Sequence, residues 1–270
     1  MKKLFLFSAV CSMTLLFSCG NNESKKEDPG KIKLSFHPVQ GQPVKIDYAF
    51  TVTQLTSGDI TGFDILMNGK ADTTDNGKIA LELKNDSIHM NGNFQGKPVH
   101  GSANGSDTLT GDIKLVAMPV FTLIGKKYRS IYDKQFDKQT EIQIDDSEAV
   151  IDSTENKMQM LLRFPAHEVA VGDSWDKEII IKTGNKMNCS AKYTLKEVKG
   201  DTAIVSITGN LFGNGEKFGN TFSIDGKITG TFTVNIKTGW ALTTDTDQEF
   251  TLKMGGKDVP MKYVIKSSMK

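Results

Sequence analysis

The sequence has few of the residues that would mark a specialised class of protein. It contains three cysteines, too few for the disulfide framework that stabilises small secreted domains. Neither sign of charge is in excess, because 33 basic residues face 32 acidic ones and the net charge is +1. A near-neutral chain gives no electrostatic reason to expect a nucleic-acid partner. Apolar residues make up 38% of the chain, an ordinary share for a folded domain, which argues against wholesale disorder.

Motifs that carry chemistry are also scarce. The four histidines, His37, His89, His100 and His167, lack the spacing of metal ligands, and neither a zinc-protease motif nor a nucleophile elbow occurs. Cys189 has no partner evident in the sequence, so a small buried apolar residue is favoured over a reactive thiol. We therefore expect no catalytic residue, no metal and no cofactor.

Two further patterns can be explained either by structure alone or by a binding site. Asp245 and Asp247 would share one face of a strand, where a solvated edge is favoured over a cation site. The glycine-rich stretch Gly209–Gly219 precedes a strand, whereas a phosphate-binding loop needs a helix after it. A hairpin loop is therefore the better prediction for this stretch.

The one long apolar run lies at the N-terminus. After Lys2 and Lys3, residues 4–18 would span about 22 Å as a helix, too short for a bilayer core of about 30 Å. The run is typical of a secretory signal. It ends in Leu16-Phe17-Ser18-Cys19, which resembles a bacterial lipobox, whose cysteine carries acyl chains such as palmitate. We expect residues 1–18 to be a lipoprotein signal peptide and Cys19 to be the lipid attachment; a plain secretory signal is the alternative.

Residues 19–31 are polar, charged and turn-forming, and they predict a flexible tether. Several acyl chains on Cys19 would hold the protein stably on a membrane. We therefore predict a protein of the cell envelope that is lipid-anchored to the outer membrane. No compact acidic run follows Cys19, which favours the periplasmic face over the cell surface.

The body of the sequence has the alternation of β-strands. Every second residue from Phe222 to Ile236 is apolar or glycine, which predicts one long strand with a buried and a solvated face. Gly226 and Gly230 lie on the apolar side, where they indicate a bend, a bulge or the close approach of another segment. Turn signals at 237–239 and 255–258 divide residues 221–266 into a three-stranded antiparallel meander.

Shorter alternations predict more strands upstream. They lie on both sides of the Lys199–Asp201 turn, through Tyr48–Val52, and on both sides of a turn at Asn85–Asp86. One helix is predicted over Thr154–Phe164, where apolar residues recur at helical spacing and Pro165 ends the run.

Together these patterns predict a mainly β protein with a long-stranded, antiparallel, curved sheet, half-barrel-like, in two halves with one or two short helices between them. The N-terminal β half would span residues 32–125, the helix-bearing middle segment 126–165 and the C-terminal β half 166–270. Apolar residues of the C-terminal meander are predicted to line a ligand site or to form the core: Phe222, Ile224, Ile228, Phe232, Trp240, Leu242, Phe250, Leu252, Met261 and Tyr263.

Four short strings of residues together resemble a known family. They are Leu123-Ile124-Gly125-Lys126-Lys127-Tyr128, Val171-Gly172-Asp173-Ser174-Trp175, Asn235-Ile236-Lys237-Thr238-Gly239 and Gly256-Lys257-Asp258-Val259-Pro260-Met261. They resemble a Bacteroidota lipoprotein family known as domain of unknown function 6263, over most of residues 35–268 and more clearly after Phe164. The family usually has Asp where Asn235 stands. It has no assigned activity, and its architecture is similar to the curved half-barrels that carry lipoproteins between membranes.

Three hypotheses for function follow. The first is a non-catalytic, lipid-anchored envelope protein that binds an apolar or amphipathic ligand in the concavity of its sheet. The second is a structural envelope lipoprotein that binds a protein partner and has no ligand pocket. The third is an enzyme, for which the sequence offers no motif, and which a cluster of histidines and carboxylates in one cleft would revive.

Overall fold

The computed structural model describes residues 30–74, 76–102, 121, 123–144, 161–182, 186–217 and 220–270. Every element with described bounds is a strand. The strands are β1 (Lys31–Ile32), β2 (Pro43–Gln54), β3 (Asp59–Thr73), β4 (Ile79–Phe94), β5 (Lys97–Ser102), β6 (Lys127–Tyr132), β7 (Lys138–Ile144), β8 (Val169–Ala170), β9 (Ser174–Lys182), β10 (Lys186–Lys199), β11 (Thr202–Lys217), β12 (Asn220–Asn235), β13 (Ala241–Met254) and β14 (Lys257–Met269).

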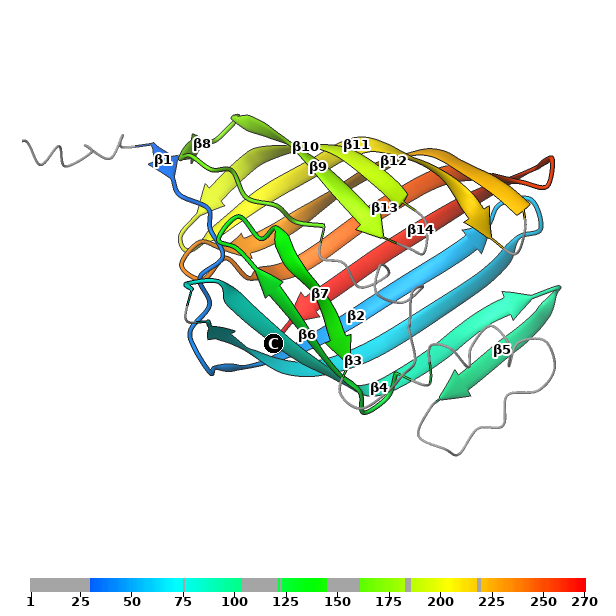
Figure 1. Ribbon diagram of the computed structural model, residues 1–270, viewed down its shortest axis with the longest axis horizontal. Helices are drawn as coiled ribbons and strands as arrows, with labels where there is room; N and C mark the ends of the chain where they lie inside the picture. Colours follow the sequence, from blue (N-terminus) through cyan, green and yellow to red (C-terminus); the bar gives the residue numbers. More distant parts are fainter. Residues whose placement is uncertain are drawn as a thin grey trace, which may run out of the picture.

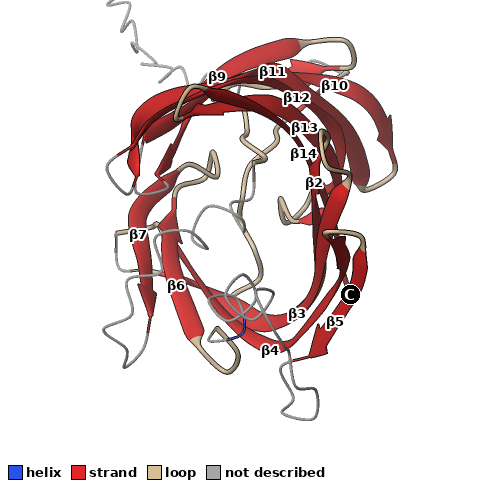
Figure 2. Cartoon of the chain, turned by 90° about the vertical axis from the view of Figure 1, so that its right-hand side faces the viewer, coloured by secondary structure: helices blue, strands red, loops and turns tan. Residues whose placement is uncertain are grey.

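One antiparallel sheet of 12 strands makes up most of the fold (Figure 1). Its order is β7-β6-β4-β3-β2-β14-β13-β12-β11-β10-β9, with β5 paired to β4 beside this path. The sheet curves around an interior, with β7 and β9 at its two edges (Figure 2). No pairing joins these two edges among the described strands, so they do not close into a barrel. The predicted mainly β fold with a long-stranded, curved, antiparallel sheet is confirmed.

The predicted C-terminal meander is also confirmed, as strands β12, β13 and β14. Strands β10 and β11 flank the Lys199–Asp201 turn as the sequence predicts. β14 then pairs with β2 of the N-terminal half, from Met261 against Gln54 to Met269 against Ile46. The two predicted halves therefore belong to one continuous sheet.

The predicted turn at Asn85–Asp86 is wrong. β4 continues through both residues, and Leu66 pairs with Ser87 while Met67 pairs with Asn85. Asp86 is therefore the extra residue of a β-bulge. A bulge and a turn favour the same residue types, so the local sequence did not distinguish them.

The predicted hairpin loop over Gly209–Gly219 is wrong for its described part, because residues 209–217 continue β11. Gly209 pairs with Ile228, and Gly213 pairs with Ile224. A glycine beside a large residue leaves room for that side chain on the same face of the sheet. These glycines therefore serve packing between strands rather than a loop.

Most of the helix predicted over Thr154–Phe164 lies outside the described residues. Its last part, Leu161–Phe164, is described, buried and without regular secondary structure. Its peptide groups bond to other segments: the backbone N–H of Phe164 donates to the carbonyl of Gln135 at 2.8 Å, and the indole N–H of Trp175 donates to the carbonyl of Arg163 at 2.9 Å. Tertiary hydrogen bonds thus replace the internal bonds of a helix here.

Gly226 and Gly230 mark the close approach of β13 to β12. A Cβ atom on Gly226 would lie 2.3 Å from the Cβ of Phe250, and one on Gly230 would lie 2.4 Å from the carbonyl oxygen of Asp245. Of the three predicted explanations, the close approach of another segment is the one observed.

The N-terminal segment crosses one end of the curved sheet. β1 pairs with β8, and the N–H of Phe36 donates to the carbonyl of Lys134 at 2.8 Å. The ring of Phe36 is fully buried, with its centroid 4.3 Å from that of Phe136 and 4.9 Å from that of Trp240. We call this the strap end. The opposite end, formed by the β2–β3 and β13–β14 turns, is the hairpin end (Figure 1).

A network of ion pairs links the two unpaired edges of the sheet. Asp137, just before β7, lies 3.1 Å from Nε of Arg163 and 3.0 Å from Nζ of Lys177 on β9. The Arg163 side chain is only 5% exposed. Since the backbones of β7 and β9 do not pair, these charge-assisted contacts connect the edges through side chains.

The predicted signal peptide, Cys19 and most of the tether lie outside the described residues. Within the part of the chain that is described, no helix has the length and apolar character needed to cross a membrane.

Candidate ligand-binding face

The curved sheet has a polar outer face and a mainly apolar inner face. On β13 the exposed Asp245 and the half-exposed Asp247 point outward, 3.3 Å from Lys266 and 3.4 Å from Lys262. The residues between them and on either side, Thr244, Thr246 and Gln248, therefore point inward. This periodicity defines the inner face of β13 and β14 as the even residues 244–252 and the odd residues 259–267.

Burial along the inner face changes from one end to the other. At the strap end, Trp240 is 6% exposed and Phe232 is 1% exposed. At the hairpin end, Phe222, Leu252 and Met261 are half-buried, and Met254 is 40% exposed. On β12–β14 the described apolar inner-face side chains are therefore incompletely covered at the hairpin end.

The ten predicted lining or core residues divide along this gradient. Ile228, Phe232 and Trp240 belong to the buried core of the strap end. Phe250 is partly buried and packs against that core. The remaining six are half-buried: Phe222, Ile224, Leu242, Leu252, Met261 and Tyr263. The strands bring eight of them onto the inner face of the meander, and Trp240 lies in the connection just before β13. Leu242 is the extra residue of a bulge where Ala241 pairs with Val234 and Thr243 with Thr233.

An aromatic pair lies at the middle of this face. The rings of Phe250 on β13 and Tyr263 on β14 meet edge to face, with centroids 4.9 Å apart. Burial raises the pKa of the Tyr263 hydroxyl above its ordinary value, so this group stays neutral at physiological pH. The pair offers an apolar surface with one uncharged polar tip.

Sequence reasoning missed two polar residues in this face. Thr246 is 1% exposed and Gln248 is 6% exposed, although both residue types usually lie at the surface. The alternation of β13 could have indicated them, because they occupy the same parity as Phe250 and Leu252. Thr246 belongs to the alternation predicted for this strand, but the predicted lining set kept only its apolar members.

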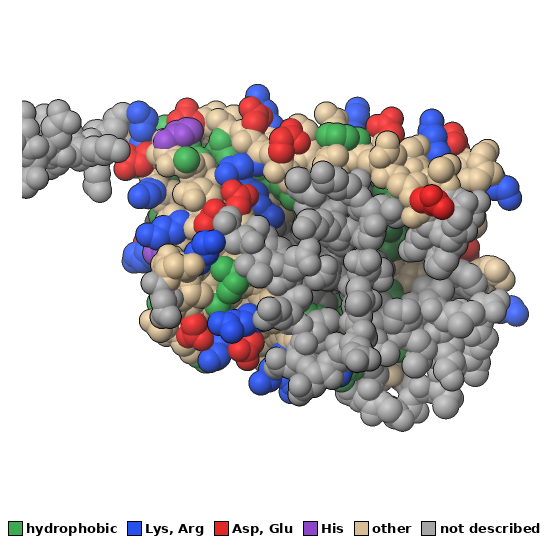
Figure 3. Space-filling model, in the orientation of Figure 1, with side chains coloured by type: hydrophobic (Ala, Val, Ile, Leu, Met, Phe, Trp, Pro, Cys, Tyr) green, Lys and Arg blue, Asp and Glu red, His purple; other side chains and the backbone are tan. Residues whose placement is uncertain are grey.

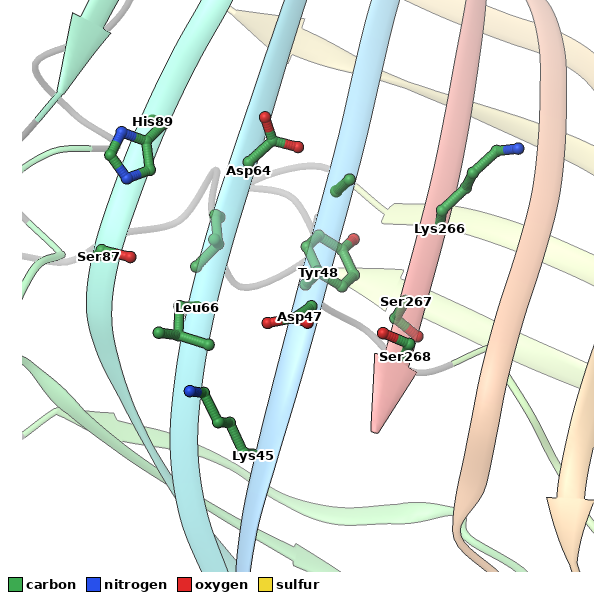
Figure 4. A pocket seen from close by; sticks show the side chains of 12 residues that line it. Lys45, Asp47, Tyr48, Asp64, Leu66, Ser87, His89, Lys266, Ser267 and Ser268 are labelled. Atoms are coloured by element: carbon green, nitrogen blue, oxygen red, sulfur yellow. The ribbon is translucent and has the colours of Figure 1, made fainter. Parts of the chain in front are cut away.

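The described grooves lie on the outer face. One, with a volume of about 430 Å³, is lined mainly by outward residues of β2, β3, β4 and β14, including Asp47, Asp64, His89 and Lys266 (Figure 4). A second, of about 370 Å³, lies over β10–β12. Lysine and aspartate side chains line both grooves, so neither has a consistent electrostatic character. On the face seen in Figure 3, charges of both signs are likewise interspersed among the described residues.

The residues considered for chemistry stay apart from one another. His37, His89, His100 and His167 are all exposed. Cys189 is fully buried, and burial raises the pKa of its thiol to about 11, with Glu178 adding to the rise and Arg163 opposing it. Among the described residues, no group of three or more histidines, cysteines or carboxylates could hold a metal ion.

Comparison with known proteins finds a similarity over part of the chain. Residues 127–241 match the family of unknown function DUF6263. The match runs from β6 to the start of β13 and contains two of the four resemblance strings whole, 171–175 and 235–239. It is shorter than the range 35–268 over which the sequence predicts a resemblance. No curated protein matches the chain.

Proposed function

We propose that this protein is a lipid-anchored protein of the cell envelope that binds an apolar or amphipathic ligand, without catalysis, on the inner face of its curved sheet. The observation that carries the proposal is the gradient of burial along that face. At the strap end Phe232 and Trp240 are buried, whereas at the hairpin end Phe222, Leu252 and Met254 retain exposed apolar surface. Folding alone gives no reason to leave one end of a core uncovered.

The anchor and location form the second part of the proposal. Cys19 would carry the acyl chains, and residues 19–31 would tether the sheet to the periplasmic face of the outer membrane. The lipobox-like string and the resemblance to a Bacteroidota lipoprotein family support this part. Mass spectrometry of the purified chain should find acylated Cys19, and Cys19→Ser should abolish acylation and release the protein from the membrane fraction.

Ligand binding is tested with the complete chain in detergent. Native mass spectrometry after mild extraction should find a co-purifying lipid. Leu252→Glu places a carboxylate in the half-buried apolar surface and should remove that lipid. Lys253→Glu, at the exposed neighbouring position on the opposite face, introduces the same group and should leave the lipid in place. Extraction of wild type with no lipid, together with no binding of added lipid, contradicts the proposal.

A protein partner is the alternative occupant of the same region. Leu55 and Met254, in or beside the two turns of the hairpin end, are 52% and 40% exposed, as residues of a protein interface can be. Crosslinking in intact envelopes separates the two functions. A defined protein crosslinked through position 254, with no lipid on the purified chain, favours the partner-binding function.

A further inference from the structure

The inner face contains a polar stripe between two hydrophobic cores. One core joins the strap end to β9–β13, and the other lies on β2–β6 and Ile265 of β14 and includes Phe50 and Phe63. Between them, Thr244, Thr246 and Gln248 point inward along β13, and Ser267 of β14 pairs with Thr244. A run of polar residues across the interior of an apolar sheet requires hydrogen-bond partners.

The buried hydroxyl group of Thr246 makes no hydrogen bond within the described part of the chain. Its Oγ1 is buried, and it is one of two buried side-chain oxygens without a hydrogen bond among the described residues. The methyl carbon Cγ2 of Thr246 packs against Gly230: a Cβ atom added at Gly230 would lie only 2.7 Å from it. The hydroxyl therefore points away from that contact. The buried side chain of Gln248 lies two residues further along the same face, beside Tyr263 of β14.

Ionised groups are absent from this stripe. The inner-face positions 244–252 of β13 and 259–267 of β14 contain no Asp, Glu, Lys, Arg or His. The described buried Arg163 and its neighbour Lys177 contact the carboxylate of Asp137 at the sheet edges instead. A charged ligand group at the stripe would therefore lose its hydration without gaining a counter-charge from these positions.

The apolar surface lies on one side of the stripe only. From Gln248 toward the hairpin end, the inner face of β13 continues with Phe250, Leu252 and Met254, and exposure rises to 40% at Met254. The eight residue steps from Thr246 to Met254 extend about 27 Å, the scale of a long alkyl chain. On the strap side, Ala241 and Trp240 close the path.

We propose that Thr246 and Gln248 bind the uncharged, hydrogen-bonding head group of a single-chain amphipath, with its alkyl chain along Phe250, Leu252 and Met254 toward the hairpin end. A hydroxyl, ester or amide head group fits, because it offers both donors and acceptors without a charge. This inference rests on the proposed ligand-binding function and specifies the class and orientation of the ligand.

The test compares three probes on the complete chain in detergent micelles. They are a C18 monoacylglycerol, the corresponding fatty acid at pH 8, and octadecene, which has the chain without a head group. Native mass spectrometry measures the bound fraction of each. We expect the monoacylglycerol to bind roughly tenfold or more tightly than octadecene, as one or two net hydrogen bonds would provide. The fatty acid should bind more weakly than the monoacylglycerol.

Two variants locate the head group. Thr246→Val and Gln248→Met preserve side-chain size and should each lower monoacylglycerol affinity roughly fivefold to tenfold, leaving octadecene binding unchanged. Thr231→Val makes the same Thr-to-Val exchange at an exposed outward position and should change neither monoacylglycerol affinity nor octadecene binding. Thermal unfolding of Thr246→Val should be at or above the wild-type temperature, because the change removes a buried hydroxyl without a partner.

Photolabelling measures the direction of the ligand's alkyl chain. A diazirine at the end of the alkyl chain should label residues 250–254. Labelling near Trp240 instead would overturn the orientation.

The outcomes separate the two proposals. Equal binding of monoacylglycerol and octadecene, tighter binding of the fatty acid, or unchanged affinity in both variants overturns the head-group inference while the proposed ligand-binding function stands. If none of the three probes binds, the head-group inference fails, and the proposed ligand-binding function fails with it when the extracted wild type also carries no lipid.

Discussion

The two ends of the curved sheet are built from the same strands, yet they differ in what covers their inner faces. At the strap end, Phe36, Phe136 and Trp240 fill the interior and are at most 6% exposed. At the hairpin end, residues of equal size, such as Phe222 and Leu252, stay half-buried. The strands alone do not make a core: the strap segment and the 161–165 segment supply the second surface against which an apolar face is buried.

Under the proposed function, the two ends of the sheet have different roles. Close packing at the strap end fixes the curvature and stabilises the fold. The hairpin end keeps apolar surface that a ligand can cover. Four predictions test this contrast, beginning with the largest expected effect.

Removing the ring of Phe36 should destabilise the protein far more than removing that of Phe222. Phe36→Ala leaves a cavity between Phe136 and Trp240 and should lower the free energy of unfolding by about 3–5 kcal/mol. Phe222→Ala removes a half-buried ring and should cost about 1 kcal/mol. Denaturant unfolding of the complete chain measures both, and equal losses would contradict the division into two ends.

Adding a methyl group at Gly230 should disturb the sheet. The new Cβ would lie 2.4 Å from the carbonyl oxygen of Asp245, a backbone atom that cannot move alone, so Gly230→Ala should cost about 1–3 kcal/mol. Gly62→Ala is the control, because its Cβ would lie 3.4 Å or more from its neighbours. A Gly230→Ala variant with an unchanged free energy of unfolding would show that β12 and β13 move apart at little cost.

Neutralising Asp137 should loosen the contact between the edges β7 and β9. Asp137→Asn removes the charge that faces Arg163 and Lys177, and should lower the free energy of unfolding by about 1–2 kcal/mol, because the carboxylate is 37% exposed and partly screened. Asp201→Asn breaks an exposed pair with Lys237 and should cost less than about 0.5 kcal/mol. In Asp137→Asn, amide hydrogen exchange should become faster in β7 and β9. Faster exchange throughout the sheet would argue against a contact specific to these edges.

Raising the pH should test how far the dry core extends toward the hairpin end. Cys189 lies on the inner face at the level of Phe250, through the pairs Cys189–Leu211, Leu211–Gly226 and Gly226–Phe250. Burial raises the folded-state pKa of its thiol to about 11 from an ordinary value of 9.0. The unfolded thiol therefore loses its proton first, and the stability present below pH 9 declines as the pH rises toward 11.

Between pH 8 and pH 10 the wild type should lose about 1 kcal/mol more stability than Cys189→Ala. The thiol should also resist alkylation at pH 8 until denaturant is added. Rapid alkylation of the folded chain would mean that solvent reaches the interior at this level.

Much of the sheet was predictable from local patterns. The alternation from Phe222 to Ile236 predicted β12, and the glycines at 239 and 255–256 predicted the turns that follow it and β13, because period-two burial and left-handed turn residues are properties of neighbouring residues. The same reasoning failed at Asn85–Asp86, where a bulge replaced a turn. Which of the two forms depends on whether a partner strand continues, which local residues do not encode.

The candidate site was predictable only in part. The inward Phe and Ile residues followed from alternation, but their gradient of burial did not, since it depends on the described segments 31–37 and 161–165, which pack at the strap end. Thr246 and Gln248 were missed because polar residues in a strand are usually assigned to solvent. They point inward since β13 keeps one register from Thr243 to Met254.

By itself, the sequence determined that this is a mainly β protein with long antiparallel strands, few polar motifs and an N-terminus typical of an anchored lipoprotein, because composition and periodicity are local properties of the chain. The tertiary structure alone decided that one sheet joins both halves through β14 and β2, that ion pairs of Asp137 link its edges, and that a polar stripe divides its interior. These features depend on contacts between residues far apart in the sequence, whose pairing is set by how the whole chain buries its apolar surface.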